Sequence, residues 1–189
     1  MFRFSYTGFM AKAFDPRRLD VRRFADEGAE LSSEDRLAGY PRLLAETEAG
    51  AGERAVHWHA RGELRNPNHV HPEIWLHLQA DAALPLVCQR CLQPVDVSLA
   101  VDRDFRFVAD EATAAAEDDE AEEDLLALSH AFDLVALVED ELLMEVPLAP
   151  RHEVCPEPVK MSAEDPDFAV ASGARENPFA VLGRLKTGK

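Results

Sequence analysis

Two cysteines, Cys88 and Cys91, lie two residues apart between two apolar runs of the chain. In the run before them, Ile74, Leu76 and Leu78 alternate with Trp75, His77 and Gln79; in the run after them, the apolar positions are Val95, Val97, Leu99 and Val101. This alternation is typical of strands with one buried face. We therefore expect a β-hairpin with both cysteines in its turn, and an antiparallel sheet around it.

The same two-residue gap recurs about sixty residues later, between His152 and Cys155. Thiolates and imidazoles in two such pairs are typical ligands of tetrahedral zinc. The candidate metal ligands are therefore Cys88, Cys91, His152 and Cys155, and zinc is the candidate cofactor.

The alternative is a pair of reduced thiols in a tight turn, with Cys155 acting as a small apolar residue. A redox Cys-x-x-Cys pair is disfavoured because it requires a helix N-terminus after a strand, whereas strand-like sequence flanks this pair on both sides.

The chain of 189 residues is 47% hydrophobic and carries 36 acidic against 20 basic residues, a formal charge of −16. This content suffices for a core, and the charge favours basic partners over nucleic acid. Residues 1–23 are locally basic, with six bases against two acids. The sequence has no apolar run of membrane-spanning length, its first residues do not resemble a signal peptide, and its three cysteines fit a reducing compartment, so we expect a cytoplasmic protein.

Several further elements follow from local patterns. Residues 21–31 are compatible with a short strand, and the capping residues at 32–35 predict a helix after them. Residues 54–64 alternate as a strand with Trp58 on the apolar face and His57 and His59 on the polar face. Those histidines are expected to face solvent rather than to bind metal.

Residues 110–124 contain nine acids, and we expect them to form a disordered loop. Asp133 is a suitable cap for an amphipathic helix over 133–146, with Glu139, Asp140, Glu141 and Glu145 mostly outward and Pro147 ending it. The overall expectation is an α+β fold: an antiparallel sheet with this helix packed on it, the acidic loop and a flexible C-terminal segment.

Three stretches together resemble the bacterial YceD family, the large ribosomal RNA subunit accumulation protein. They are Cys88-Gln89-Arg90-Cys91, the acidic helix of 133–143 running into Pro147-Leu148-Ala149-Pro150-Arg151-His152, and Asn177-Pro178-Phe179-Ala180-Val181-Leu182. The resemblance spans residues 21–186. We divide the chain into an N-terminal segment 1–20, a YceD-like domain 21–155 and a C-terminal tail 156–189 with a short helix over 178–186.

The resemblance implies a role in the synthesis, processing or stability of 23S ribosomal RNA, and hence in accumulation of the large ribosomal subunit. It implies no catalytic or cofactor-binding residues, and some relatives carry more cysteines after the prolines than the single Cys155 here. We expect a non-enzymatic factor that acts through a ribosomal protein or an rRNA processing or assembly factor, because the acidic charge favours basic partners. We expect no membrane partner, and the oligomeric state stays open.

The alternative is direct binding of a 23S rRNA precursor by the β region. The residues for this are the N-terminal bases, Arg90, Arg103 and Arg106, with Trp58, Trp75 and Phe107 as stacking surfaces. An enzyme is the third class. The sequence contains neither a glycine-rich phosphate loop nor a Gly-x-Ser-x-Gly or His-Glu-x-x-His motif, which disfavours this class.

Overall fold

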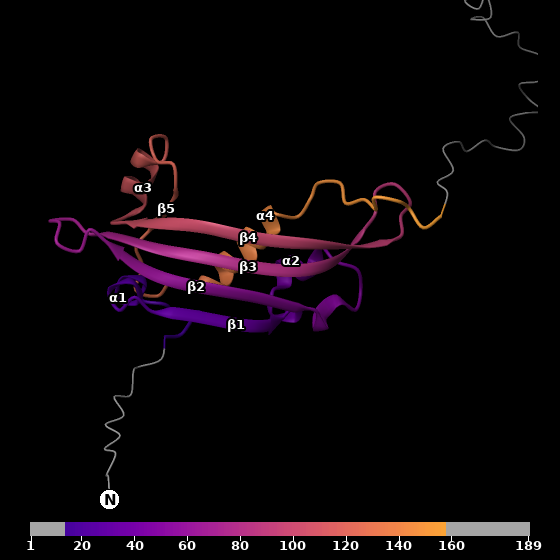
Figure 1. Cartoon of the computed structure of the whole chain (residues 1–189), viewed down its shortest axis with the longest axis horizontal. Coiled ribbons are helices and arrows are strands. Elements are labelled where there is room, and N and C mark those ends of the chain that lie inside the picture. Colours follow the sequence, from indigo (N-terminus) through magenta and orange to yellow (C-terminus); the bar gives the residue numbers. More distant parts are fainter. Residues whose placement is uncertain (1–13, 158–189) are drawn as a thin grey trace, which may run out of the picture. The chain divides into compact units, whose positions relative to one another are not determined.

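The computed structural model describes residues 14–157, and its centre is a five-stranded sheet in the order β1-β2-β3-β4-β5 (Figure 1). The first four strands are antiparallel, and β5 pairs in parallel with β4. The strands are β1 (Glu30–Arg36), β2 (Ala55–Arg65), β3 (Glu73–Val87), β4 (Pro94–Val108) and β5 (Asp124–Ala127). The α-helices are α1 (Val21–Asp26), α2 (Pro41–Ala45), α3 (Glu111–Glu117) and α4 (Leu134–Met144), and the short 3₁₀ turns are η1 (Leu37–Gly39) and η2 (Ala51–Glu53).

Alternation along β2, β3 and β4 gives the sheet one apolar face and one polar face. Leu76 and Leu78 on β3 and Phe105 on β4 are almost fully buried, and α1 and α4 pack on the sheet. The predicted α+β fold, the strand over 54–64 and the hairpin around the cysteines are confirmed. His57 and His59 lie on the polar face, beside the carboxylates of Asp81 and Glu30 respectively.

Helix α4 begins as predicted. The Asp133 carboxylate accepts a hydrogen bond from the Ala136 amide at 2.9 Å, and Leu134, Val138 and Leu142 are fully buried. The expected outward orientation of the acids is wrong for two of them, because Glu139 and Glu141 are only 6% and 5% exposed.

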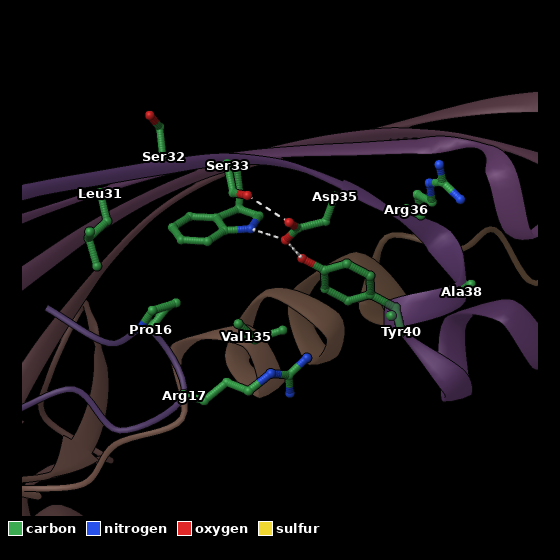
Figure 2. A pocket seen from close by; sticks show the side chains of 12 residues that line it. Pro16, Arg17, Leu31, Ser32, Ser33, Asp35, Arg36, Ala38, Tyr40 and Val135 are labelled. Atoms are coloured by element: carbon green, nitrogen blue, oxygen red, sulfur yellow. Dashed lines mark hydrogen bonds between the residues drawn. The ribbon is translucent and has the colours of Figure 1, made fainter. Parts of the chain in front are cut away.

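The N-terminal third folds differently from the local prediction. The expected short strand over 21–31 is wrong for residues 21–26, which form α1, capped by Asp20. The capping candidates at 32–35 lie within β1, and the helix expected after them is present in shortened form as η1 and α2. The carboxylate of Asp35 accepts hydrogen bonds from the Ser33 hydroxyl at 2.6 Å, the Tyr40 hydroxyl at 2.8 Å and the Trp58 indole N–H at 2.9 Å (Figure 2). These partners and the pairing with β2 outweigh the local capping preference of Ser33 and Asp35.

The acidic segment 110–124 is not the disordered loop that its composition predicts. Asp110 caps α3, and the segment ends at the first residue of β5. Two arginines of β4 explain the order: Arg106 pairs with Glu117 and Glu123, and Arg103 pairs with Asp124 at 2.8 Å. These ion pairs offset the repulsion between the acids.

Both predicted terminal segments lie largely outside the described residues. Of the N-terminal segment, residues 14–20 are described, and Leu19 is buried and exchanges backbone hydrogen bonds with Phe132 at 2.8 and 2.9 Å. Of the C-terminal tail, only residues 156 and 157 are described, so the expected helix over 178–186 and the flexibility of the tail lie outside them. Of the helices in residues 14–157, none is both long and apolar enough to span a membrane.

Candidate metal centre

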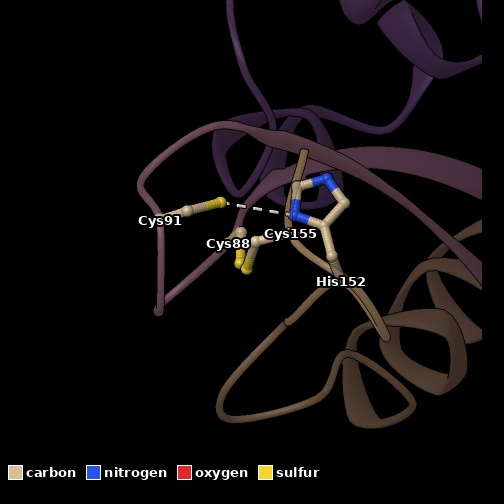
Figure 3. A group of neighbouring side chains, drawn as sticks. All are labelled: Cys88, Cys91, His152 and Cys155. Atoms are coloured by element: carbon tan, nitrogen blue, oxygen red, sulfur yellow. Dashed lines mark hydrogen bonds between the residues drawn. The ribbon is translucent and has the colours of Figure 1, made fainter. Parts of the chain in front are cut away.

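The β3–β4 turn places two sulfur ligands close together. Cys88 follows the last residue of β3, and the turn is closed by hydrogen bonds from the Cys88 amide to the Gln93 carbonyl at 3.0 Å and from the Leu92 amide to the Cys88 carbonyl at 2.9 Å. Leu92 has a positive φ of 59°, a conformation uncommon outside glycine. This tight turn brings the thiols of Cys88 and Cys91 to one side (Figure 3).

The segment after α4 brings the imidazole to this turn. The Gln89 amide donates a hydrogen bond to the Pro150 carbonyl at 2.8 Å, which ties the turn to the segment two residues before His152. The Sγ atom of Cys91 then lies 3.4 Å from Nδ1 of His152, although 61 positions separate the two residues in sequence. The two ligand pairs predicted from the sequence therefore meet in space.

One ligand atom from each of Cys88, Cys91, His152 and Cys155 lies within 4.8 Å of the other three. Around a zinc ion with Zn–S bonds near 2.3 Å, tetrahedral geometry separates two sulfurs by about 3.8 Å, so small side-chain movements bring this set into coordination range. Cys88 is buried, and the other three side chains are half-buried. Three thiols and one imidazole form a closed ligand set typical of structural zinc sites.

The electrostatics of Cys88 favour the thiolate that a metal requires. Burial on its own raises the pKa of this thiol, but backbone amides of Cys91, His152 and Arg90 donate hydrogen bonds to its sulfur, and the His152 side chain adds another interaction. Together these groups lower the pKa of Cys88 to about 5. A thiol in this environment is largely ionised at neutral pH and ready to coordinate a metal.

The stacking surfaces expected for RNA binding are not available. Trp58, Phe107 and Trp75 are only 5%, 5% and 9% exposed, so the prediction that these rings form an open platform is wrong. The alternating pattern placed Trp58 and Phe107 on the buried sheet face, and the Arg65 guanidinium covers the Trp75 ring at 3.9 Å.

The arginines expected to contact RNA backbone are also engaged. Arg103 pairs with Asp124 and with Glu141, and Arg106 pairs with Glu117 and Glu123. Of the arginines in the β region that were predicted to contact RNA, Arg90 alone has no such carboxylate contact within residues 14–157. It is an exposed residue in the β3–β4 turn.

A second concave site was not anticipated from the sequence. It is a pocket of about 660 Å³ between β1, η1 and residues 16–17, and Asp35, Tyr40 and Trp58 contribute to its wall (Figure 2). Asp35 and Tyr40 are five positions apart and Trp58 lies on the neighbouring strand, and none of the three belongs to a recognisable motif. The pocket exists because residues 30–36 form a strand, which the local sequence did not indicate.

The fold and the cluster define a small α+β protein with a Cys₃His candidate metal centre at one end of a long hairpin. Comparison with known proteins gives the family. Residues 76–186, more than half of the chain, match the family model described as large ribosomal RNA subunit accumulation protein YceD, and the chain belongs to this family.

A curated relative from Haemophilus influenzae, also named large ribosomal RNA subunit accumulation protein YceD, is 36% identical over 106 residues. That alignment covers 53% of this chain and 59% of the relative, so the chain spans somewhat more than half the length of the relative it matches. No solved structure matches the chain. The family match includes all four cluster residues. Strands β1 and β2 lie before it, and so do all the residues that line the 660 Å³ pocket except Val135.

Proposed function

We propose that this protein is a non-enzymatic factor in the synthesis, processing or stability of 23S ribosomal RNA, and hence in accumulation of the large ribosomal subunit, acting through a protein partner. The observation that carries the proposal is the family match over residues 76–186, which includes the candidate metal centre. The name of the Haemophilus influenzae relative agrees with it.

The charge distribution supports a protein partner over direct RNA binding. The formal charge of −16 repels a phosphate backbone and attracts basic protein segments, such as those of ribosomal proteins or of rRNA processing and assembly factors. Burial of Trp58 and Phe107 and the ion pairs of Arg103 and Arg106 remove the main elements of an RNA-binding surface from the sheet.

The cysteine–histidine cluster has the donor chemistry for a structural zinc ion, and we include zinc binding in the proposal. Cys88, Cys91, His152 and Cys155 would hold the ion, which would link the β3–β4 turn to the segment after α4. Four protein ligands leave no open position for substrate, so the ion would stabilise structure rather than catalyse a reaction.

The cellular role is tested by the ratio of 23S to 16S ribosomal RNA in a strain that lacks the gene, with pulse labelling of new 23S RNA. We expect a lower ratio, and the pulse rate distinguishes reduced synthesis from later loss. Complementation with the wild-type gene, a Cys91→Ser variant and a Gln93→Ala control from the same turn connects the cluster to the role. An unchanged ratio in the deletion strain under several growth conditions would contradict the proposed function.

Zinc binding is tested on the purified full chain by elemental analysis. We expect about one zinc per chain in the wild type and in Gln93→Ala, and a strongly reduced content in Cys88→Ser and Cys91→Ser, because each change removes one ligand. Equal zinc content in all four proteins would show that the ion is not bound at this cluster.

A further inference from the structure

Strand β1 is the edge strand of the sheet. Within residues 14–157 it pairs with β2 alone, in a register where Ser33 is opposite Trp58. The Gly62 amide donates a hydrogen bond to the Ala29 carbonyl, and the Leu37 amide donates one to the Arg54 carbonyl. In an antiparallel pair, hydrogen-bonded positions alternate, so the odd-numbered residues of β1 are those whose backbone groups bond to β2. The N–H and C=O groups of Glu30, Ser32, Glu34 and Arg36 therefore point away from the sheet.

These outward groups have no backbone partner within residues 14–157. The hydrogen bonds of the described chain include none to the N–H or C=O of Ser32 or Glu34. An edge of this kind is a template for an additional strand, and proteins that bind peptides by strand addition use it.

The pocket of about 660 Å³ lies directly at this edge. Side chains of Leu31, Ser33 and Asp35 face it from β1, and Trp58 and Val135 contribute apolar surface to its wall (Figure 2). A strand added along β1 would place every second side chain on the pocket side of the sheet.

The interior of the pocket favours an apolar side chain. The Asp35 carboxylate already accepts three hydrogen bonds, from Ser33, Tyr40 and Trp58, so the main buried acceptor of the wall needs no further partner. A large aliphatic or aromatic side chain could cover Leu31, Trp58 and Val135 without leaving the Asp35 carboxylate unpaired.

The opposite face of the edge favours basic side chains. Glu30 and Glu34 project from β1 on the polar side of the sheet, with side chains 59% and 74% exposed. A second copy of the chain would bring another formal charge of −16 to this edge, whereas a basic peptide is attracted to it.

We propose that the free edge of β1 binds an extended basic peptide segment of a partner protein as a sixth strand, with one large apolar side chain of the peptide in the adjoining pocket. The Lys or Arg residues that alternate with apolar residues in such a segment would lie beside Glu30 and Glu34. The inference rests on the proposed function for the biological source of the peptide, but the site itself is defined by β1 and its pocket.

The test uses the full chain and a synthetic peptide, acetyl-Lys-Val-Lys-Phe-Lys-Val-Lys-amide, which alternates basic and apolar residues. Binding is measured by fluorescence anisotropy, and amide hydrogen exchange is measured at Ser32 and Glu34. We expect saturable binding with at least tenfold slower exchange at these two amides, because their N–H groups become hydrogen-bonded to the added strand.

Matched peptides separate the parts of the site without changing the protein. N-methylation of alternate peptide amides should weaken binding at least tenfold, and replacing the central Phe by Ala or every Lys by Glu should also weaken it severalfold. In the protein, Ser32→Pro removes an outward N–H and should abolish strand addition, whereas Ser32→Ala keeps that N–H and should retain most of the binding.

Three outcomes would overturn the inference. Equal affinity of the N-methylated peptide would show attraction by charge alone, and protection of amides elsewhere would place the peptide at another site. A dimer in light scattering whose formation protects Ser32 and Glu34 would assign the edge to a second copy of the chain. Each result can occur with a normal or an altered 23S to 16S ratio, so failure here is distinguishable from failure of the proposed function.

Discussion

Glu139 on α4 accepts two hydrogen bonds from Arg42, one from the backbone amide at 2.7 Å and one from Nε at 3.0 Å. Its carboxylate also accepts a bond from the Leu43 amide at 3.2 Å. Helix α2 begins with Pro41, and its N-cap residue Tyr40 makes no side-chain capping bond. A carboxylate from a distant helix therefore satisfies the first free amides of α2 and fixes α2 against α4.

Replacing this capping carboxylate should destabilise the fold. Glu139→Ala leaves the amides of Arg42 and Leu43 without their acceptor, while the Arg42 guanidinium keeps its pairing with Asp140. We expect a loss of about 2–3 kcal/mol in the free energy of unfolding. Chemical denaturation measures this loss. Glu145→Ala, an exposed acid at the end of the same helix, is the control and should change stability by less than about 0.5 kcal/mol. Similar effects of both variants would argue against the capping role.

The contact between β2 and α1 depends on a glycine. A Cβ atom at Gly62 would lie 2.7 Å from the Phe24 ring and 2.8 Å from the Phe24 carbonyl, and the backbone at that point cannot move away easily. We expect Gly62→Ala to destabilise the protein by about 1–3 kcal/mol. At Gly39 nothing lies within 4 Å of an added Cβ, so Gly39→Ala should be near neutral in the same thermal or chemical unfolding experiment. A neutral Gly62→Ala variant would show that α1 does not pack this closely.

The buried carboxyl of Glu141 should make stability depend on pH. Burial raises the pKa of Glu141 above its ordinary value of 4.5, the nearby Arg103 acts in the opposite direction, and the acids Asp124, Asp140 and Glu145 raise it further. The folded state therefore holds the Glu141 proton more tightly than the unfolded state does. As pH rises from 4.5 through the folded pKa, this carboxyl ionises and its contribution to the free energy of unfolding decreases.

Glu141→Gln removes that titration. The difference in free energy of unfolding between the variant and the wild type should shift in favour of the variant as pH rises from 4.5 to 7. Denaturant titrations at several pH values measure the shift. If the wild type instead gains stability over the variant as pH rises across this range, the ion pair with Arg103 outweighs burial and the expectation is wrong.

Removal of the metal from zinc-loaded protein should weaken the fold. The ion would join the β3–β4 turn to the segment that follows α4, so we expect a strong chelator to lower the free energy of unfolding by several kcal/mol and Tm by about 10 °C. Thermal scans of the full chain, with and without chelator, measure the change. The Cys91→Ser variant should have a lower Tm from the start and respond little to chelator; an equal response would place the stabilising ion elsewhere.

Much of the sheet and of α4 could be predicted because local sequence and final environment agree there. Alternation around Cys88 and Cys91 matches a half-buried hairpin, and Asp133 followed by an apolar stripe matches a capped helix. The candidate ligands were also predictable as residue types, since two Cys/His pairs with two-residue gaps are local patterns.

The sequence by itself determined the hairpin, the capped helix and the chemical identity of the four candidate ligands, because each depends on residues within a few positions of one another. Tertiary structure decided the rest. It made residues 30–36 a strand through pairing with β2, ordered the acidic segment through Arg103 and Arg106, and buried Glu139 and Glu141 against arginines of other elements. It also placed His152 beside Cys91, 61 positions away in the sequence. The energy of such a contact depends on the distance between the two groups in space, and no local sequence pattern encodes that distance.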